Sequence, residues 1–236
     1  GRKAIHLMTE EERKVSPKIE DMFIDIGAKT AAEAGKHVRV SDPVTLDVCM
    51  RRLLNDRVAC RGFDDRIGAL VVIETLLEVA KRKPKVALWS VATVQEEVGL
   101  RGARTSAFGV DPHVGIAVDV GHASDYAGVE KEKRKLGDVR VGNGPILCRG
   151  PNINSKVQHG LEAVAKARKI PYQMQAEPRA TGTDANAMQL NRAGVATALV
   201  SIPTRYMHTP VEVINLGDAD HTIRLLTEYV LSLKAT

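Results

Sequence analysis

The sequence has few aromatic residues, and this shortage argues against two kinds of binding surface. Phe, Tyr and Trp together make up 3% of the 236 residues. A carbohydrate cleft, or a platform for single-stranded nucleic acid, needs rings on which sugars or bases can stack. We therefore expect no nucleic-acid partner.

Cysteines are scarce, and long apolar runs are missing. The three cysteines are odd in number and form no CxxC pair. This pattern indicates a reducing compartment and no thiolate metal site. No apolar run approaches the length of a membrane span, and residues 1–6 do not resemble a signal peptide. These features predict a cytoplasmic protein with no membrane partner.

Charge is plentiful but spread along the chain. There are 34 basic and 29 acidic residues, which gives a net charge of +5. The densest run, Lys-Glu-Lys-Arg-Lys at 131–135, contains an acid, and we interpret it as a solvated loop or strand edge. Apolar residues make up 44%, enough to form the core of one large domain, with or without a small one.

The first part of the chain has the pattern of a small β-rich module, which we place at residues 1–58. The expected strands cover residues 22–26, 38–40 and 44–47. The turn sequence Ser-Asp-Pro separates the last two strands. Thr30 can cap a short helix over residues 31–35.

From residue 59 to residue 236, helical and strand patterns alternate. The expected helices cover residues 64–82, 155–169, 184–192 and 218–233, and the expected strands cover residues 86–94, 114–120 and 197–202. The expected strands at 86–94 and 114–120 are mainly apolar, which is typical of buried strands. This alternation predicts an α/β domain whose central sheet is mostly parallel and flanked by helices.

Acidic and imidazole side chains occur at the borders of these elements. They are Asp64 and Asp65 before a helix, Glu96 and Glu97 after the strand at 86–94, Asp119 near the end of the strand at 114–120, and His208 after the strand at 197–202. In an α/β sheet, ligands bind outside the carboxyl ends of the strands. Three strands therefore bring Glu97, Asp119 and His208 to one edge. Carboxylates and imidazole suit zinc, cobalt or manganese.

Each of these residues also has an ordinary structural interpretation. Adjacent glutamates usually lie on solvated surfaces, Asp64 can be only a helix cap, and His208 can be a loop histidine. The pair Glu96-Glu97 gains weight because it directly follows an apolar strand. One glutamate could then bind a metal while the other acts on a metal-bound water as general base. His122, three residues after Asp119, could contact a metal ligand without binding the metal itself.

Five motifs together resemble the tetrahedral (TET) aminopeptidase family, which includes glutamyl and deblocking aminopeptidases. They are Phe-Asp-Asp-Arg-Ile-Gly at 63–68, Val-Gln-Glu-Glu-Val-Gly-Leu-Arg-Gly-Ala at 94–103, Ala-Val-Asp-Val at 117–120, Thr-Gly-Thr-Asp-Ala at 181–185 and Ile-Pro-Thr-Arg-Tyr-Met-His-Thr-Pro at 202–210. Each motif is weak alone, but the set is specific and runs along nearly the whole chain.

The resemblance implies a two-metal peptidase site. Asp64 matches the carboxylate that bridges two divalent ions, Zn²⁺ or Co²⁺, and Glu96 matches the general base. Glu97 and Asp119 match ligands of separate ions, and His208 matches an imidazole ligand.

The resemblance also implies surroundings and partners for the site. Thr183 and Asp184 match the wall near the substrate, and Asp65 and His122 are expected behind the metal ligands. The substrates would be short peptides. The β-rich module would serve dimerisation, and the dimers would assemble into a homo-oligomeric dodecamer.

One departure from the family pattern is visible. The family's first metal ligand is the histidine of a His-x-Asp motif upstream of the dimerisation module, and this sequence contains no His-x-Asp. The catalytic domain is therefore expected to lack its N-terminal segment. Two alternatives stay open: an inactive or truncated assembly subunit, and a different hydrolase on the same scaffold. A deacylase belongs to the second group, as does a glycosidase, which needs two carboxylates and usually no metal.

Overall fold

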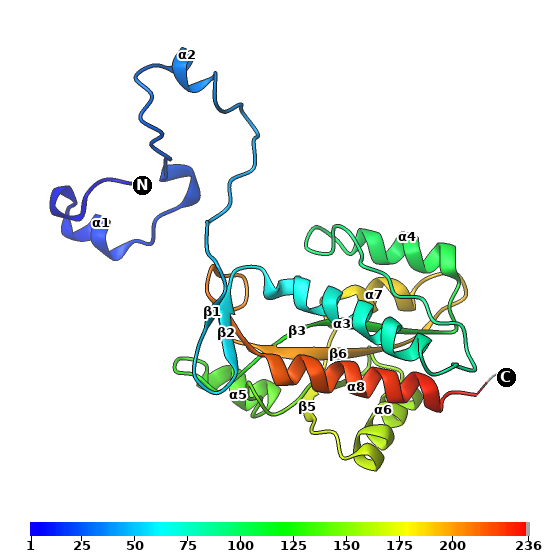
Figure 1. The fold of residues 1–236 in the computed structure, drawn as a ribbon. Helices are drawn as coiled ribbons and strands as arrows, with labels where there is room; N and C mark the ends of the chain where they lie inside the picture. Colours follow the sequence, from blue (N-terminus) through cyan, green and yellow to red (C-terminus); the bar gives the residue numbers. More distant parts are fainter. Residues whose placement is uncertain (235–236) are drawn as a thin grey trace. The chain divides into compact units, whose positions relative to one another are not determined.

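The chain forms two compact units in the computed structural model, Gly1–Thr45 and Leu46–Thr236 (Figure 1). The structure describes residues 1–234. The division into a dimerisation module at 1–58 and a catalytic domain at 59–236 stays a prediction, because it concerns the roles of the two parts. No helix within the described residues has the length and apolarity needed to cross a membrane.

The first unit consists of short helical turns joined by irregular chain. Its helices are η1 (Ile5–Leu7), α1 (Glu10–Lys14), η2 (Ile19–Asp21) and α2 (Ala31–Ala34). The predicted short helix is confirmed, and the Thr30 hydroxyl caps α2 by accepting the amide hydrogen of Glu33 at 3.1 Å.

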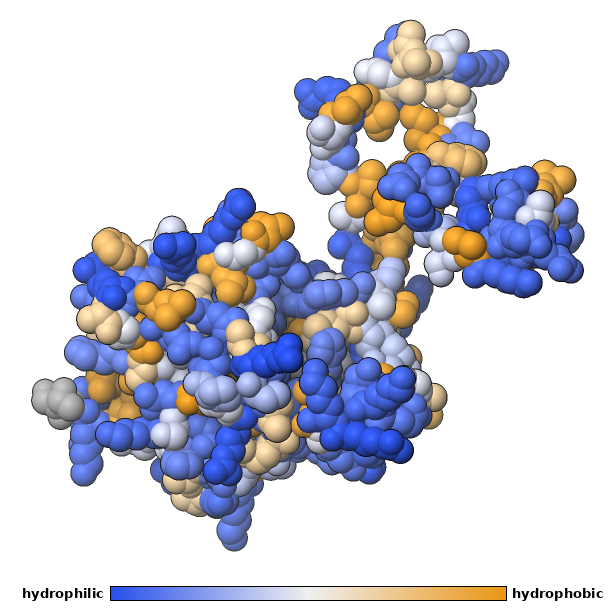
Figure 2. Space-filling view, turned by 180° about the vertical axis from the view of Figure 1, so that it is seen from behind, coloured by the Kyte–Doolittle hydropathy of each residue, from blue (hydrophilic) through white to orange (hydrophobic). Residues whose placement is uncertain are grey.

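The three strands predicted in this unit are wrong. Residues 22–26, 38–40 and 44–47 form no strand, and no residue of the unit is buried. An alternating pattern makes a strand only where a neighbour pairs with its backbone groups. Within the described residues of these three runs, only Phe23 pairs with a distant residue, Gly1, and no strand forms there. Large hydrophobic side chains such as Ile19 and Val40 therefore stay exposed. Figure 2 shows hydrophobic side chains standing among hydrophilic ones on the surface.

The second unit is built on a four-stranded sheet in the order β3-β6-β4-β5. The strands are β3 (Val114–His122), β6 (Ala196–Thr204), β4 (Ile146–Arg149) and β5 (Gln173–Ala176). The pairs β3–β6 and β4–β5 are parallel and β4–β6 is antiparallel, so the predicted mostly parallel sheet is confirmed. Every residue from 197 to 204 is buried, which means that both faces of the sheet are covered at β6.

A small antiparallel sheet lies beside the start of α3. It contains β1 (Arg51–Arg52), β2 (Arg57–Cys60) and β7 (Glu212–Asn215) in that order. The register pairs Cys60, the last residue of β2, with Glu212, the first residue of β7. Because α3 follows β2 after only two residues, this pairing brings residue 212 close to the helix start.

The helices cover the larger sheet (Figure 1). They are α3 (Phe63–Ala80), α4 (Arg101–Val110), α5 (Glu130–Leu136), α6 (Ser155–Arg168), α7 (Asp184–Gln189) and α8 (Leu216–Ser232). Helix α8 packs against both α3 and α6, and α7 packs against α4, β3 and β6. The four predicted helices are confirmed, although α7 ends at Gln189 and not at 192.

The charged run at 131–135 lies in α5, so its prediction as a loop or strand edge is wrong. Glu130 and Glu132 stand in the first turn of α5, beside Lys131, and the other three bases of the run stand in the last turn. That order complements the partial charges at the two helix ends, and it favours an exposed helix.

The apolar run at 86–94 does not form the buried strand predicted for it. Half-buried and exposed residues alternate along it. The half-buried ones are Val86, Leu88 and Ser90, and the exposed ones include Trp89 and Val91. The alternation is that of a strand, but the described residues provide no neighbour that pairs with this segment. Apolar composition alone therefore does not produce a strand here.

Candidate functional site

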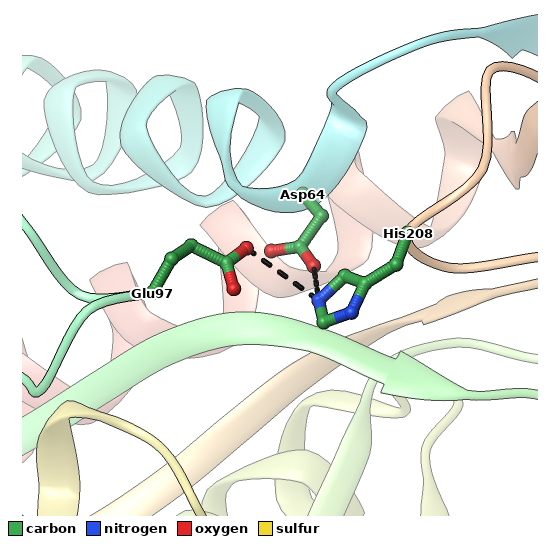
Figure 3. Close-up of side chains that lie close together, drawn as sticks. All are labelled: Asp64, Glu97 and His208. Carbon is green, nitrogen blue, oxygen red and sulfur yellow. Dashed lines mark ion pairs between the residues drawn. The ribbon is translucent and has the colours of Figure 1, made fainter. Parts of the chain in front are cut away.

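Three side chains from distant parts of the second unit converge on one point. Asp64, Glu97 and His208 each offer a ligand atom, and these atoms all lie within 4.8 Å of one another. His208 Nε2 lies 2.9 Å from Asp64 Oδ2 and 3.5 Å from Glu97 Oε1. Figure 3 shows the three side chains pointing toward one another. They come from the start of α3, the loop that precedes α4, and the loop between β6 and β7.

The cluster is buried on one side and open on the other. The Asp64 side chain is 11% exposed, whereas those of Glu97 and His208 are 59% and 64% exposed. Burial raises the pKa of Asp64 above its usual range, and the charge of Glu97 acts in the same direction. A ligand could therefore reach the cluster from solvent while Asp64 holds it from inside.

The fold at the start of α3 directs the two aspartates differently. Both residues have non-helical backbone angles within α3. Asp65 Oδ1 accepts the amide hydrogen of Gly68 at 3.0 Å, so Asp65 caps the helix that continues beyond the non-helical residues. A Cβ at residue 68 would lie 2.2 Å from Asp65 Oδ2, so only glycine leaves room for this cap. Asp64 is thereby free to face His208.

Two further carboxylates lie behind the cluster and carry strongly raised pKa values. Burial, followed by the negative charge of Asp119, raises the pKa of Asp65 to about 9. Burial raises the pKa of Asp119 to about 7, and the charges of Asp64 and Glu96 contribute. Like charges influence one another in this way only at short range. Asp119 is thus a neighbour of the cluster, although it is not one of the three converging residues.

Glu96 and Asp184 form the remaining part of the acidic site. Burial, then the charges of Asp184 and Glu97, raise the pKa of Glu96 to about 7. Burial also raises the pKa of Asp184, against the hydrogen bond that its Oδ2 accepts from Thr93 Oγ1 at 2.6 Å. Its other oxygen, Oδ1, is buried without a hydrogen-bond partner among the described residues. A carboxyl with a pKa near neutrality can both take up and release a proton at physiological pH.

The other two predicted site residues lie at the margins. Thr183 is buried, and its hydroxyl lies 2.8 Å from that of Thr181. His122 is the last residue of β3 and is exposed. Protein atoms that displace water from around its ring lower its pKa, and the charge of His208 acts in the same direction. The roles assigned to Thr183 and His122 stay predictions.

The donor atoms of this site fit divalent metal ions. Carboxylate oxygens and an imidazole nitrogen are the usual ligands of zinc, cobalt and manganese. The raised pKa values of Asp64, Asp65, Glu96 and Asp119 reflect burial and the charges of nearby carboxylates, which the charge of His208 offsets only in part at Asp64 and Glu96. Bound cations are often the largest charges in such a site, and they favour the ionised form of the acids around them.

Glu212 belongs to the site's framework, and the sequence analysis missed it. Its side chain is 2% exposed, and it accepts the amide hydrogens of Phe63, Asp64 and His208. A signal was present, because this acid interrupts an apolar stretch four residues after His208. An acid in such surroundings is costly to bury unless its oxygens are paired.

Arg205 is a basic residue close to the site that is already neutralised. Its guanidinium forms two hydrogen bonds to the carboxylate of Asp125, at 2.7 and 2.6 Å. The pair is largely buried, and Asp125 also accepts the amide hydrogen of Val141. Arg205 is therefore not a free cation that could hold an acidic substrate.

Comparisons with known proteins agree with this geometry. The family model described as M42 glutamyl aminopeptidase matches residues 1–225. A lysyl aminopeptidase of Pyrococcus furiosus is 41% identical over 216 residues, which cover 91% of this chain and 60% of that protein. The structure of an aminopeptidase from Desulfurococcus kamchatkensis superposes with a TM-score of 0.87 at 36% identity, over 99% of this chain and 64% of the other.

A structure of the Pyrococcus horikoshii TET1 peptidase, described as assembling into a tetrahedron or a large octahedral shell, has a TM-score of 0.76 at 27% identity. That match covers 89% of this chain and 60% of the other. The chain thus spans somewhat less than two thirds of the length of these relatives. The resemblance identified from the five sequence motifs is confirmed: the chain belongs to the M42 glutamyl aminopeptidase family.

Proposed function

We propose that this chain carries most of the active site of a metal-dependent aminopeptidase, which removes N-terminal residues from short peptides. The observation that carries the proposal is the convergence of Asp64, Glu97 and His208 to within 4.8 Å, next to Glu96. The family match and the relatives named aminopeptidases support the same activity.

Four residues of the site would hold two metal ions. Asp64 would bridge them, Glu97 and Asp119 would each bind one, and His208 would supply the imidazole ligand. The ions, zinc or cobalt, would polarise the scissile carbonyl and lower the pKa of a water molecule. Their identity and number are part of the proposal.

Glu96 would act as the general base. Its pKa of about 7 places it near the point where uptake and release of a proton are balanced at neutral pH. It would take a proton from the attacking water and then deliver that proton to the leaving amine. Its half-buried position beside the exposed Glu97 keeps it within reach of a peptide entering from solvent.

The acidic surroundings would favour substrates that enter with a free N-terminus. A free α-amino group carries a positive charge near neutral pH, whereas an internal peptide bond does not. The carboxylates around Glu96, among them Asp184 and Glu97, raise its pKa and would attract that amino group. Thr183 and Asp184 would form part of the wall that contacts the substrate.

The family relatives suggest a homo-oligomer. The Pyrococcus horikoshii relative is described as forming a tetrahedral or octahedral shell, and another TET1 structure as a dodecamer. We propose that this chain takes part in an assembly of the same type, through copies of itself.

Hydrolysis of aminoacyl-p-nitroanilides by the metal-loaded chain tests the proposal. We expect release of nitroaniline from free aminoacyl substrates, none from their N-acetylated forms, and loss of activity with a chelator. Activity that survives the chelator would indicate a different hydrolase. A chain that binds no metal and releases no product would instead support the inactive assembly subunit.

A further inference from the structure

Glu212 has a place in the fold that the proposed chemistry does not use. It is the first residue of β7 and lies opposite Cys60, at the end of β2. Its carboxylate is enclosed by protein, with 2% of the residue exposed. A buried carboxylate is costly unless hydrogen bonds or opposite charges compensate for the lost water.

Both oxygens of Glu212 accept backbone hydrogen bonds, and they connect two separate segments. Oε2 accepts the amide hydrogens of Phe63 at 2.6 Å and Asp64 at 3.2 Å. Oε1 accepts the amide hydrogen of His208 at 3.1 Å. One carboxylate thus joins the start of α3 to the loop between β6 and β7.

The bonds at the start of α3 satisfy groups that the helix itself leaves free. The first amide hydrogens of a helix have no partner within it, and negative charge is favourable at that end. Phe63 and Asp64 are the first two residues of α3. Glu212 therefore holds the turn that precedes the kink at Asp64 and Asp65, while Asp65 caps the helix beyond that kink.

The bond to His208 holds a backbone conformation that is otherwise unfavourable. His208 has a φ of 61°, in the left-handed region that residues with a side chain rarely occupy. Tyr206, two residues earlier, has a φ of 58°. Such conformations persist only where surrounding contacts hold them, and they are concentrated at functional sites.

We infer that Glu212 is a positioning residue for the proposed metal site. By tying the backbone of Asp64 to that of His208, it brings Oδ2 of the first to within 2.9 Å of Nε2 of the second. It acts through these two residues and not as a ligand. The inference rests on the proposed function, because it assigns the alignment a purpose in binding metal.

A carboxylate suits this position better than an amide. Three amide hydrogens approach the two oxygens of Glu212, and each oxygen can accept. In Glu212→Gln one oxygen becomes an NH₂ group, which cannot accept a hydrogen bond from a peptide group. Either the α3 side or the His208 side then loses its partner.

Asp218 offers a matched control. It is 1% exposed, and its two oxygens accept the amide hydrogens of Gly142 and Gly144, each at 2.7 Å. Neither glycine is a residue of the proposed site. Asp218→Asn therefore disturbs a buried carboxylate of the same kind without touching Asp64 or His208.

The test is titration of the metal-free chain with Co²⁺, followed by equilibrium dialysis and by the visible absorption of the bound ion. We expect Glu212→Gln to weaken Co²⁺ binding about 10- to 100-fold and to change the absorption spectrum. We expect Asp218→Asn to match the wild type in both measurements, even where its melting temperature falls as far. Wild-type affinity and spectrum in Glu212→Gln would overturn the inference. A wild-type chain that binds no Co²⁺ would instead overturn the metal site.

Amide hydrogen exchange of the wild-type chain is a second test of the inference, and it needs neither a variant nor a metal. The amide hydrogens of Asp64 and His208 should exchange slowly, although the His208 side chain is largely exposed. Slow exchange at both positions supports the positioning role of Glu212. Exchange at His208 as fast as in an unprotected loop would overturn it, whatever the outcome with Co²⁺.

Discussion

Residues 86–94 and 114–120 are both mainly apolar, and acidic site residues lie in or just after each. Only the second forms a strand: β3 pairs along nine residues with β6, from Val114–Ala196 to His122–Thr204. No strand pairs with the first within the described residues 1–234, and Trp89 and Val94 are 67% and 68% exposed. The comparison teaches that backbone pairing, and not apolar content, decides which run becomes part of the core.

The residues of the candidate site differ in the same way, since some belong to paired elements and others follow the unpaired run. Asp119 lies on β3, Asp64 begins α3, and His208 follows β6 and is tied to Glu212. Glu96 and Glu97 follow the unpaired run. One half of the site, the anchored half, thus rests on β3, α3 and Glu212. The half that carries the proposed base lies in a turn whose backbone hydrogen bonds run locally, within residues 94–102.

The largest effect is expected on the less anchored half. Glu96→Gln should lower aminopeptidase activity about 100- to 10,000-fold, because the amide cannot accept the proton of the attacking water. The metal content should stay at the wild-type value, since Glu96 is not a proposed ligand. Glu97→Gln is the matched variant, and it should lose metal. Full activity in a metal-loaded Glu96→Gln chain would show that another group is the base.

The second prediction concerns stability. Ile202→Ala removes a side chain with no exposure from β6, and it should lower the free energy of unfolding by about 2–5 kcal/mol. Trp89→Ala, in the unpaired run, should change it by less than about 0.5 kcal/mol, because the ring is already largely in water. Urea unfolding of both variants measures the difference. Equal losses would mean that residues 86–94 are packed as firmly as β6.

The third prediction is that a bound metal ion stabilises both halves of the site. A site that combines Asp64 and His208 with Glu97 should be stabilised by Zn²⁺ or Co²⁺, by about 2.7 kcal/mol when the free ion is 100-fold above its Kd. Thermal unfolding with and without metal measures this shift. Limited proteolysis should show slower cleavage near Glu97 when metal is present. An unchanged cleavage rate there, with a raised melting temperature, would indicate that metal binds only to the anchored half.

A smaller effect is expected from pH. An acid whose pKa is higher in the folded chain binds more protons there than in the unfolded chain. Its contribution to stability is therefore present at low pH and is lost as pH rises from about 4 through the folded pKa, about 7 for Asp119 and about 9 for Asp65. The metal-free chain should thus melt at lower temperature at pH 9 than at pH 5.

Asp65→Asn is the control for this pH dependence. The asparagine oxygen can still accept the amide hydrogen of Gly68, so the cap of α3 is kept while the titration is removed. The variant should show a flatter dependence of melting temperature on pH. A slope as steep as in the wild type would mean that Asp65 does not titrate as described.

Local signals in the sequence predicted much of this fold. The helix at 155–169 and the strand at 114–120 have clear periodicity or apolar runs, and both are confirmed. Short strands such as β4 and β7 were missed, because four residues carry little pattern. The run at 86–94 was assigned wrongly, because a sequence does not show whether a paired neighbour is present.

The candidate site was predicted in its ligands but not in its framework. Asp64, Glu97 and His208 could be named from motif order, and the structure places them together. Glu212 could not be found in this way, since its partners depend on the register between β2 and β7. That pairing is a tertiary contact, and no spacing along the chain encodes it.

The central claim is that Asp64, Glu97 and His208 form a metal site, and metal counting tests it most directly. The wild-type chain, His208→Ala and His159→Ala would each be dialysed against Zn²⁺ and analysed for bound metal. His159 lies exposed on α6 and serves as the control histidine. We predict bound zinc in the wild type and in His159→Ala, and a clear loss in His208→Ala. Equal zinc in all three chains, or none in the wild type, would contradict the account.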